Sequence, residues 1–231
     1  MTPADSTAFI IFTKGPIPGE VKTRLCPPLT ADEAASLHGT LVLDAIERTK
    51  GLAGARLYVA GAPDITHPFF KVLAGRFQAT LLAQHGSDLG ERMHHAFQDV
   101  FALGHRSAVL TGVDLPALPR AYLLEALKLI PVHDLVLGPT RDGGYYLIGL
   151  RRLMPELFHN IAWSTSSVRA DTLAKAQDLG LAVGLLPESR DLDDLDDLHA
   201  FIALAGKDGH ISKRTGGTLR LIEGRLKERK L

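Results

Sequence analysis

Three cationic side chains follow a short apolar run near the start of the chain, in the segment TKGPIPGEVKTRL at residues 13–25. They belong to Lys14, Lys22 and Arg24. Gly15 permits a tight backbone turn, and Lys22 and Arg24 face the same side if the chain is extended there. Ligands of open α/β sheets bind at the carboxyl ends of strands. We therefore expect these three cations to bind a nucleotide through its phosphates, with Lys22 also acting in catalysis; a solvated basic loop is the alternative.

Two aspartates are candidates for holding a metal ion. Asp114 follows an apolar run in VLTGVDLPAL at 109–118, and Asp193 lies in the acidic segment ESRDLDDLDDL at 188–198. Mg²⁺ is held by one or two carboxylates together with phosphate oxygens and water. We expect Asp114 and Asp193 to hold Mg²⁺ or Mn²⁺, and Asp114 to be catalytic. The alternative for Asp114 is a turn residue, which is common for Asp close to Pro.

Two adjacent glycines, Gly143 and Gly144, lie in GPTRDGGYYLIGL at 138–150 and let the backbone approach a ligand. We expect them to contribute to the nucleotide site, and a Gly-Gly hairpin turn is the alternative. The sequence lacks several other motifs. In the first loop the spacing from Gly19 to Lys22 does not fit a Walker A loop, which needs Gly directly before Lys, and GxGxxG, HExxH and GxSxG are absent from the sequence.

Apolar runs alternate with helix-spaced patterns, which predicts an α/β fold with a mixed, mostly parallel sheet flanked by helices. Seven runs predict strands at 8–13, 55–60, 78–83, 107–112, 134–139, 145–150 and 181–186. Six segments predict helices at 30–49, 66–75, 88–103, 119–129, 166–179 and 195–205, with N-caps at Thr30, Asp88 and Asp194. The link between 139 and 145 is too short for a crossover helix, so we expect an antiparallel hairpin there.

The chain has 231 residues, no formal net charge, 45% apolar and 23% charged residues, as is typical of a globular protein. We expect one domain over 1–206 and a basic helical tail over 207–231, in which eight Lys and Arg stand against three acidic residues. Leu219, Ile222 and Leu226 have the spacing of one helix face. The tail is therefore expected to pack on the domain or on the second subunit of a homodimer.

The same composition argues against several kinds of protein. Zero net charge disfavours a nucleic-acid partner, because the phosphate backbone requires excess cations, and binding through the basic tail alone ranks last. The single cysteine, Cys26, excludes an internal disulfide. No apolar run is long enough for a membrane span and no signal-peptide pattern opens the sequence, so we expect a cytoplasmic protein.

Six segments in order carry a family resemblance: KGPIPGEVKTRL, DLGERMHHAF, LTGVDLPAL, GPTRDGGYYLIGL, WSTSSVRADTLAKAQDLGL and DLDDLDDL. Over residues 8–205 the chain resembles the small bacterial glycosyltransferase-A-like family that includes radical-SAM- or selenodomain-associated and arsenosugar-biosynthesis transferases. It is more distantly similar to 2-phospho-L-lactate guanylyltransferase and molybdenum-cofactor guanylyltransferase.

This resemblance implies a nucleotide-diphospho-sugar transferase fold with a nucleotide held by the first loop. The positions that match the family's motifs are Lys14, Gly15, Lys22 and Arg24 for the nucleotide, and Asp114 for the metal. The family's acidic pattern places Asp193 as a second metal-site aspartate, with Asp194 where that pattern has threonine.

Two reactions and one non-catalytic role are open at this point. The leading hypothesis is a Mg²⁺-dependent transferase with a nucleotide-sugar donor and a small-molecule acceptor. The second is nucleotidyl transfer, as in guanylyltransferases, to a phosphorylated small molecule. Tyr145 and Tyr146 stand where the lactate guanylyltransferases resemble GGTNxL, which favours glycosyl transfer. The third is a nucleotide-binding module without activity, because no general base is evident.

Overall fold

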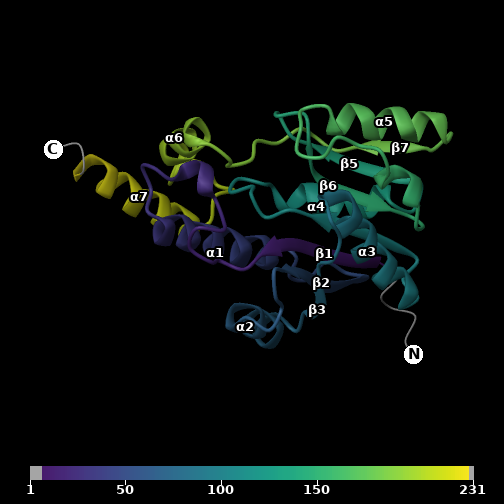
Figure 1. The fold of residues 1–231 in the computed structure, drawn as a ribbon, viewed down its shortest axis with the longest axis horizontal. Coiled ribbons are helices and arrows are strands. Elements are labelled where there is room, and N and C mark those ends of the chain that lie inside the picture. The colour runs from purple at the N-terminus through teal and green to yellow at the C-terminus, as the bar shows by residue number, and fades with distance from the viewer. Residues whose placement is uncertain (1–6, 229–231) are drawn as a thin grey trace.

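Seven strands form one sheet in the order β3-β2-β1-β4-β6-β5-β7 in the computed structural model, which describes residues 7–228 (Figure 1). They are β1 (Thr7–Lys14), β2 (Ala55–Ala62), β3 (Thr80–Ala83), β4 (Ser107–Thr111), β5 (Leu135–Pro139), β6 (Tyr145–Leu150) and β7 (Val183–Leu185). Each matches one predicted run to within two residues at either end. Strand β6 is antiparallel to β4 and β5, whereas the other pairings are parallel. The predicted mixed, mostly parallel sheet is confirmed.

The helices also follow the sequence prediction. They are α1 (Ala31–Arg48), α2 (Pro68–Phe77), α3 (Leu89–Ala102), α4 (Arg120–Leu129), α5 (Val168–Asp178), α6 (Leu195–Leu204) and α7 (Lys213–Glu228), with 3₁₀ turns η1 (Thr23–Leu25) and η2 (Pro155–Phe158). The three predicted N-caps, Thr30, Asp88 and Asp194, each accept a backbone N–H three residues on. These bonds satisfy N–H groups that the first helical turn leaves without partners.

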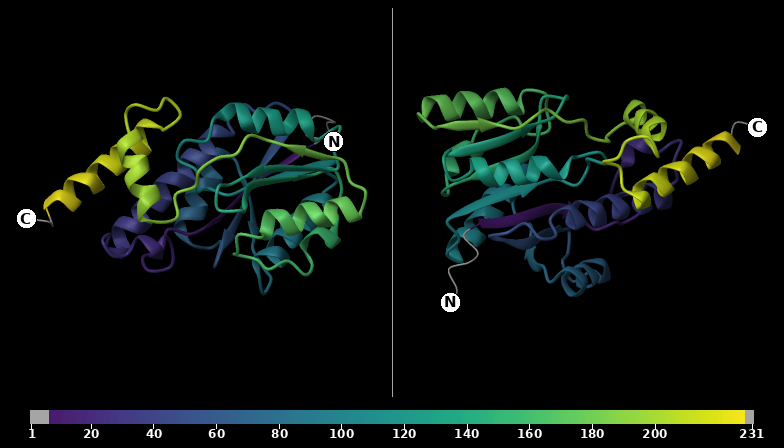
Figure 2. Two further views of the ribbon diagram at one scale, coloured as in Figure 1. Left: turned by 90° about the horizontal axis from the view of Figure 1, so that it is seen from above. Right: turned by 180° about the vertical axis from the view of Figure 1, so that it is seen from behind.

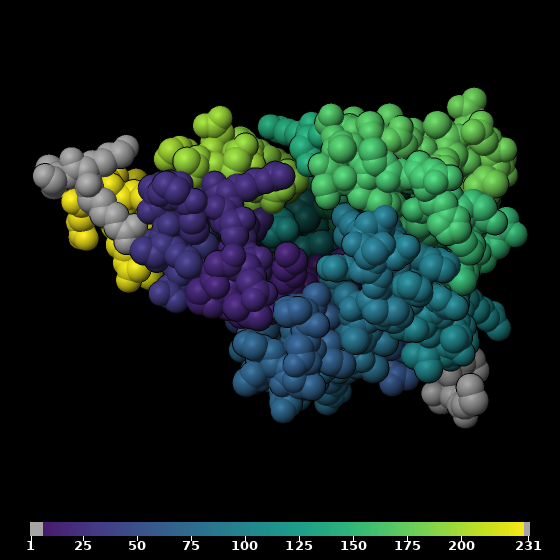
Figure 3. Space-filling view, in the orientation of Figure 1, coloured from purple at the N-terminus to yellow at the C-terminus, as the bar shows by residue number. Residues whose placement is uncertain are grey.

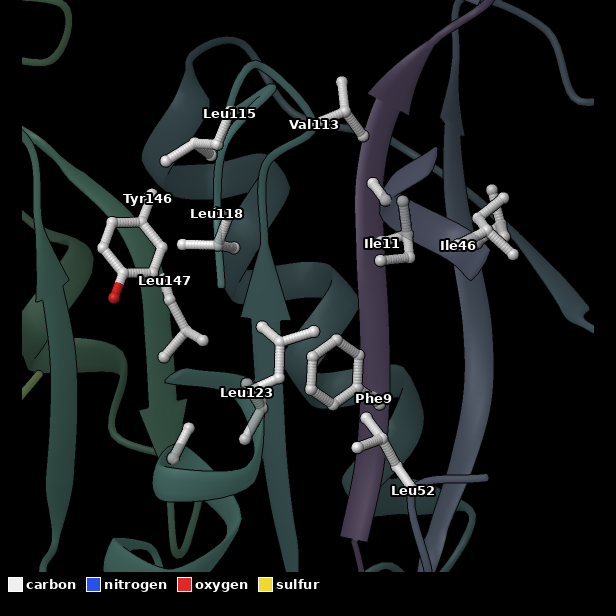
Figure 4. Close-up of a cluster of buried hydrophobic side chains, with 14 of the residues drawn as sticks. Phe9, Ile11, Ile46, Leu52, Val113, Leu115, Leu118, Leu123, Tyr146 and Leu147 are labelled. Atoms are coloured by element: carbon white, nitrogen blue, oxygen red, sulfur yellow. The ribbon is translucent and has the colours of Figure 1, made fainter. Parts of the chain in front are cut away.

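Side chains alternate between the two faces of the sheet, and both faces are covered by helices. Phe9 and Ile11 of β1 pack in a cluster with residues of α1, α2 and α4, part of which Figure 4 shows. Ala8 and Ile10 of the same strand pack on the opposite face in a cluster with residues of α3, α5 and η2. This two-sided burial explains why β1 is a continuous apolar run rather than an alternating one.

A third apolar cluster lies beyond the sheet, where α7 packs against α1 and α6 (Figures 1 and 2). Leu219 and Ile222 of α7 are buried in it, together with Leu25 of η1 and Leu192. We call this set the end cluster; its buried members are Leu25, Leu29, Ala34, Leu37, Leu41, Leu192, Leu198, Phe201, Ile211, Leu219 and Ile222.

A buried carboxylate fixes the start of α7 on α1. Asp44 is 2% exposed and accepts hydrogen bonds from Ser212, from Arg214 Nη1 at 2.6 Å and from Thr215 Oγ1 at 2.5 Å. A buried charge without partners is strongly unfavourable, so these contacts hold the tail in one position. None of the helices within residues 7–228 is long and apolar enough to cross a membrane.

Candidate active site

The loops after β1, β4, β5 and β7 meet at one edge of the sheet, because these strands all run in the same direction. They border a cleft of about 800 Å³. Figure 3 shows it as a hollow between the purple segment after β1, the blue-green α3 and the green segment before α5. The predicted phosphate-binding loop and both predicted metal aspartates contribute to its lining.

The ammonium group of Lys22 lies between the two predicted metal aspartates. Its Nζ is 2.7 Å from Asp114 Oδ1 and 3.1 Å from Asp193 Oδ1, and it donates to the carbonyl oxygen of Leu192. Only 5% of the Lys22 side chain is exposed, whereas 39% of Asp114 and 40% of Asp193 are exposed. Burial by itself lowers the pKa of Lys22, but attraction to the two carboxylates raises it above its usual value.

The backbone around Lys22 is not extended, which corrects the expected geometry of the loop. Lys22 has a φ of 50° in the left-handed region, and the next three residues form η1. The two-residue alternation of a strand therefore does not apply to Lys22 and Arg24. The side chain of Lys22 is buried against the aspartates, while Arg24 is exposed at the cleft.

Two further aspartates lie next to Asp193. Asp142, in the turn between β5 and β6, and Asp191 each offer a carboxylate oxygen, and these atoms and one of Asp193 all lie within 4.8 Å of one another. Burial, together with repulsion from Asp142 and Asp193, raises the pKa of Asp191 to about 7. Three carboxylates at this spacing form a set of oxygen donors that suits Mg²⁺ or Mn²⁺.

Six of the eight predicted site residues line the cleft: Lys14, Lys22, Arg24, Asp114, Gly144 and Asp193. Gly15 is not among the lining residues, and its N–H donates to the carbonyl oxygen of Ala62 at 2.7 Å. Gly143 does not line the cleft either. Its φ is 92°, and a Cβ there would lie 2.0 Å from the carbonyl oxygen of Ser166. Glycine is therefore required at this turn both by its backbone conformation and by packing.

His38 of α1 lines the cleft, although no motif in the sequence identifies it. Its Nε2 is 3.1 Å from the carbonyl oxygen of Lys14, and its Nδ1 is 4.0 Å from Asp114 Oδ1. Burial lowers the pKa of His38, and Asp114 only partly offsets this. Asp142 and Asp191 stand in segments that the sequence singles out, but their proximity depends on the order of the strands.

The wall of the cleft opposite the basic loop is formed where Trp163 packs on the first turn of α3. A Cβ added at Gly90 would lie 2.2 Å from Trp163 Nε1. We expect Gly90→Ala to displace the indole ring and to lower the free energy of unfolding by about 1–3 kcal/mol through overpacking. Trp163 is the only tryptophan in the sequence, so its fluorescence spectrum reports the displacement directly.

A matched control is Gly75→Ala in α2, where nothing within residues 7–228 other than the adjacent turns of the same helix lies within 4 Å of the added Cβ. Alanine favours a helix over glycine by about 1 kcal/mol, so this variant should be at least as stable as the wild type and keep its spectrum. An unchanged tryptophan spectrum in Gly90→Ala would show that the close packing of Trp163 on α3 is wrong.

Comparison with known proteins places this cleft in a transferase-like fold. The model of a family described as "Uncharacterized protein conserved in bacteria (DUF2064)" matches residues 45–165. A protein from Desulfovibrio desulfuricans G20, provisionally named a nucleotide-diphospho-sugar transferase, is 33% identical, and the match covers 97% of this chain and 98% of that one with a TM-score of 0.88. A cytidylyltransferase from Leptospira borgpetersenii has the same fold at 14% identity, covering 98% of this chain and 96% of that one with a TM-score of 0.56.

The curated relatives match over a shorter stretch. The 2-phospho-L-lactate guanylyltransferase of Methanocaldococcus jannaschii is 24% identical over 142 residues, which cover 62% of this chain and 59% of that protein. The chain thus aligns with less than two thirds of that relative's length. These findings confirm the distant similarity to 2-phospho-L-lactate guanylyltransferase and the similarity to a nucleotide-diphospho-sugar transferase that the sequence motifs indicate.

Proposed function

The chain belongs to the DUF2064 family, and from its cleft we propose that it is a Mg²⁺- or Mn²⁺-dependent transferase that takes a nucleotide-sugar as donor. The observation that carries this proposal is the convergence of Asp114 and Asp193 on one cation, the ammonium of Lys22. A pair of carboxylates that holds one cation can also hold a metal ion, and Mg²⁺ is commonly bound by one or two carboxylates together with substrate phosphates. The pair lies at the edge of the sheet where ligands of α/β folds bind. The 33% identical relative, whose provisional name is nucleotide-diphospho-sugar transferase, supports the same donor class.

The residues that would hold the metal are Asp114 and Asp193, with Asp142 and Asp191 beside Asp193. Their carboxylate oxygens are the hard donors that Mg²⁺ and Mn²⁺ prefer, so the site fits such an ion. When bound, the ion would supply positive charge that neutralises the donor diphosphate as its bond to the transferred group breaks.

The basic loop would hold and orient the donor. Lys14 and Arg24 line the cleft, and neither side chain forms an ion pair within the part of the chain that the structure describes. Both are available to phosphate oxygens, and the guanidinium of Arg24 can bind two of them at once. Catalysis by such a site consists of positioning and charge stabilisation.

Nucleotidyl transfer to a phosphorylated small molecule is the second candidate. The observation that favours it is the similarity to 2-phospho-L-lactate guanylyltransferase. The two reactions release different products, because glycosyl transfer releases a nucleoside diphosphate or monophosphate, whereas nucleotidyl transfer from a triphosphate releases pyrophosphate.

A ligand screen tests the proposal and separates the candidates. Wild type and Asp114→Ala are melted with nucleoside triphosphates, diphosphates and nucleotide-sugars, with and without Mg²⁺. We expect a nucleotide-sugar to raise the melting temperature of the wild type only with Mg²⁺, and Asp114→Ala to lose this shift. A shift confined to a triphosphate, with release of pyrophosphate, would establish nucleotidyl transfer instead. Binding without Mg²⁺ and without turnover would support a nucleotide-binding module that lacks activity.

A further inference from the structure

The ammonium of Lys22 is held inside the protein by three oxygen atoms. It donates hydrogen bonds to Asp193 Oδ1 and to the carbonyl oxygen of Leu192, and it forms an ion pair with Asp114 Oδ1 at 2.7 Å. Because the side chain is only 5% exposed in this position, the ammonium is not presented to a phosphate in the cleft. The same contacts place a positive charge next to Oδ1 of both aspartates, so a metal ion cannot bind those atoms beside it without strong repulsion.

We propose that Lys22 is a tethered cation that occupies the Asp114–Asp193 pair until a divalent metal ion displaces it, and that the displaced ammonium then binds the donor phosphates. This inference rests on the proposed function, because it concerns the same metal and the same donor. It makes the binding of metal and nucleotide cooperative. The metal ion releases the ammonium of Lys22 for the donor phosphates, and a nucleotide that binds this ammonium keeps it away from the metal site. By thermodynamic linkage, each ligand therefore raises the affinity for the other by the same factor.

The surroundings of Lys22 favour movement of its side chain rather than of the loop. Val21 and Leu25, on either side of it, are 5% and 0% exposed, so the backbone is anchored at both ends. Lys22 itself keeps a left-handed backbone conformation that is uncommon for residues other than glycine and is found at functional sites. The side chains of the two aspartates are each about two-fifths exposed at the cleft, whereas Asp114 Oδ1, the atom that contacts Lys22, is buried.

Titration with Mn²⁺ alone, without nucleotide, tests whether Lys22 competes with the metal. Free Mn²⁺ is followed by electron paramagnetic resonance for wild type, Lys22→Gln, Arg24→Gln and Asp193→Asn. We expect Lys22→Gln to bind Mn²⁺ at least about tenfold more tightly than wild type, because the competing ammonium is gone. The matched control Arg24→Gln removes the same charge from an exposed cleft residue that forms no ion pair with a carboxylate of residues 7–228, and should change the affinity by less than about threefold at physiological salt.

Chemical labelling of the wild type provides a second readout that needs no variant. In the metal-free protein Lys22 is protected from reductive methylation by its burial, whereas the exposed Lys14 serves as an internal reference. Mass spectrometry of the peptides should show that Mn²⁺ exposes Lys22 to labelling and that a bound nucleotide protects it again.

The outcomes separate this inference from the proposed function. Equal Mn²⁺ affinity of wild type and Lys22→Gln, with binding lost in Asp193→Asn and no change in the labelling of Lys22, would overturn the exchange and leave the metal site intact. Absence of Mn²⁺ binding by wild type and Lys22→Gln alike would overturn the metal site, and with it the exchange.

Discussion

Asp193→Asn is expected to remove the Mg²⁺ dependence of donor binding and to lower kcat/KM by at least about 100-fold. Asp193 contacts the ammonium of Lys22 and also lies within the group formed with Asp142 and Asp191. Asp193 is therefore common to both candidate sets of metal ligands, the pair with Asp114 and the group with Asp142 and Asp191. Asparagine keeps one oxygen but loses the charge, so the change acts on cation binding while conserving the shape of the side chain. Titration of the melting temperature and of turnover with Mg²⁺ measures the effect.

The same segment contains a matched control. Asp196, in the first turn of α6, is exposed, and its replacement by asparagine removes an equal charge away from the cleft. Negative charge at a helix N-terminus contributes only about 0.3–1 kcal/mol, so Asp196→Asn should retain wild-type turnover. If Asp193→Asn kept its full response to Mg²⁺, the metal would have to be bound without Asp193, and the proposed site would be wrong.

Leu219→Ala should lower the free energy of unfolding by about 2–5 kcal/mol, because it opens a cavity in a fully buried position. Leu219 of α7 is 0% exposed in the end cluster, which also contains Leu25 of the basic loop and Leu192 between two site aspartates. Loss of packing there is expected to loosen the two segments that bring Lys22 and Asp193 together. Urea unfolding measures the stability, and Mn²⁺ affinity measures the effect on the site.

Leu221, two residues further along α7, provides the comparison. It is 69% exposed, so Leu221→Ala removes the same side chain without creating a cavity. We expect a change of about 0.5 kcal/mol or less, as for most surface substitutions. Equal stability of the two alanine variants would show that α7 does not pack on α1 and α6 as described.

The position of β6 shows why the sheet could be predicted only in part. The five residues between β5 and β6 leave no room for a helix, so the hairpin follows from chain length alone. The sequence does not predict the second strand that pairs with β6, because local patterns do not specify the order of strands in a sheet. In the structure β6 inserts between β4 and β5, which brings the turn that contains Asp142 to the edge where Asp114 and Asp193 lie.

The candidate site, like the sheet, could be predicted from the sequence only in part. The sequence by itself determined the strands, the helices and their caps, because apolar period and capping residues act over a few neighbours. It also singled out Asp114 and the basic loop from their places after strands, and Asp193 from the acidic segment before a helix, as candidate site residues that the structure places at one cleft. Only the tertiary structure decided that Lys22 lies in the carboxylate pair rather than free in the cleft, and that Asp191 joins Asp142 and Asp193. These contacts join residues far apart in the chain, and their electrostatic energy depends on distances that only strand order and helix packing set.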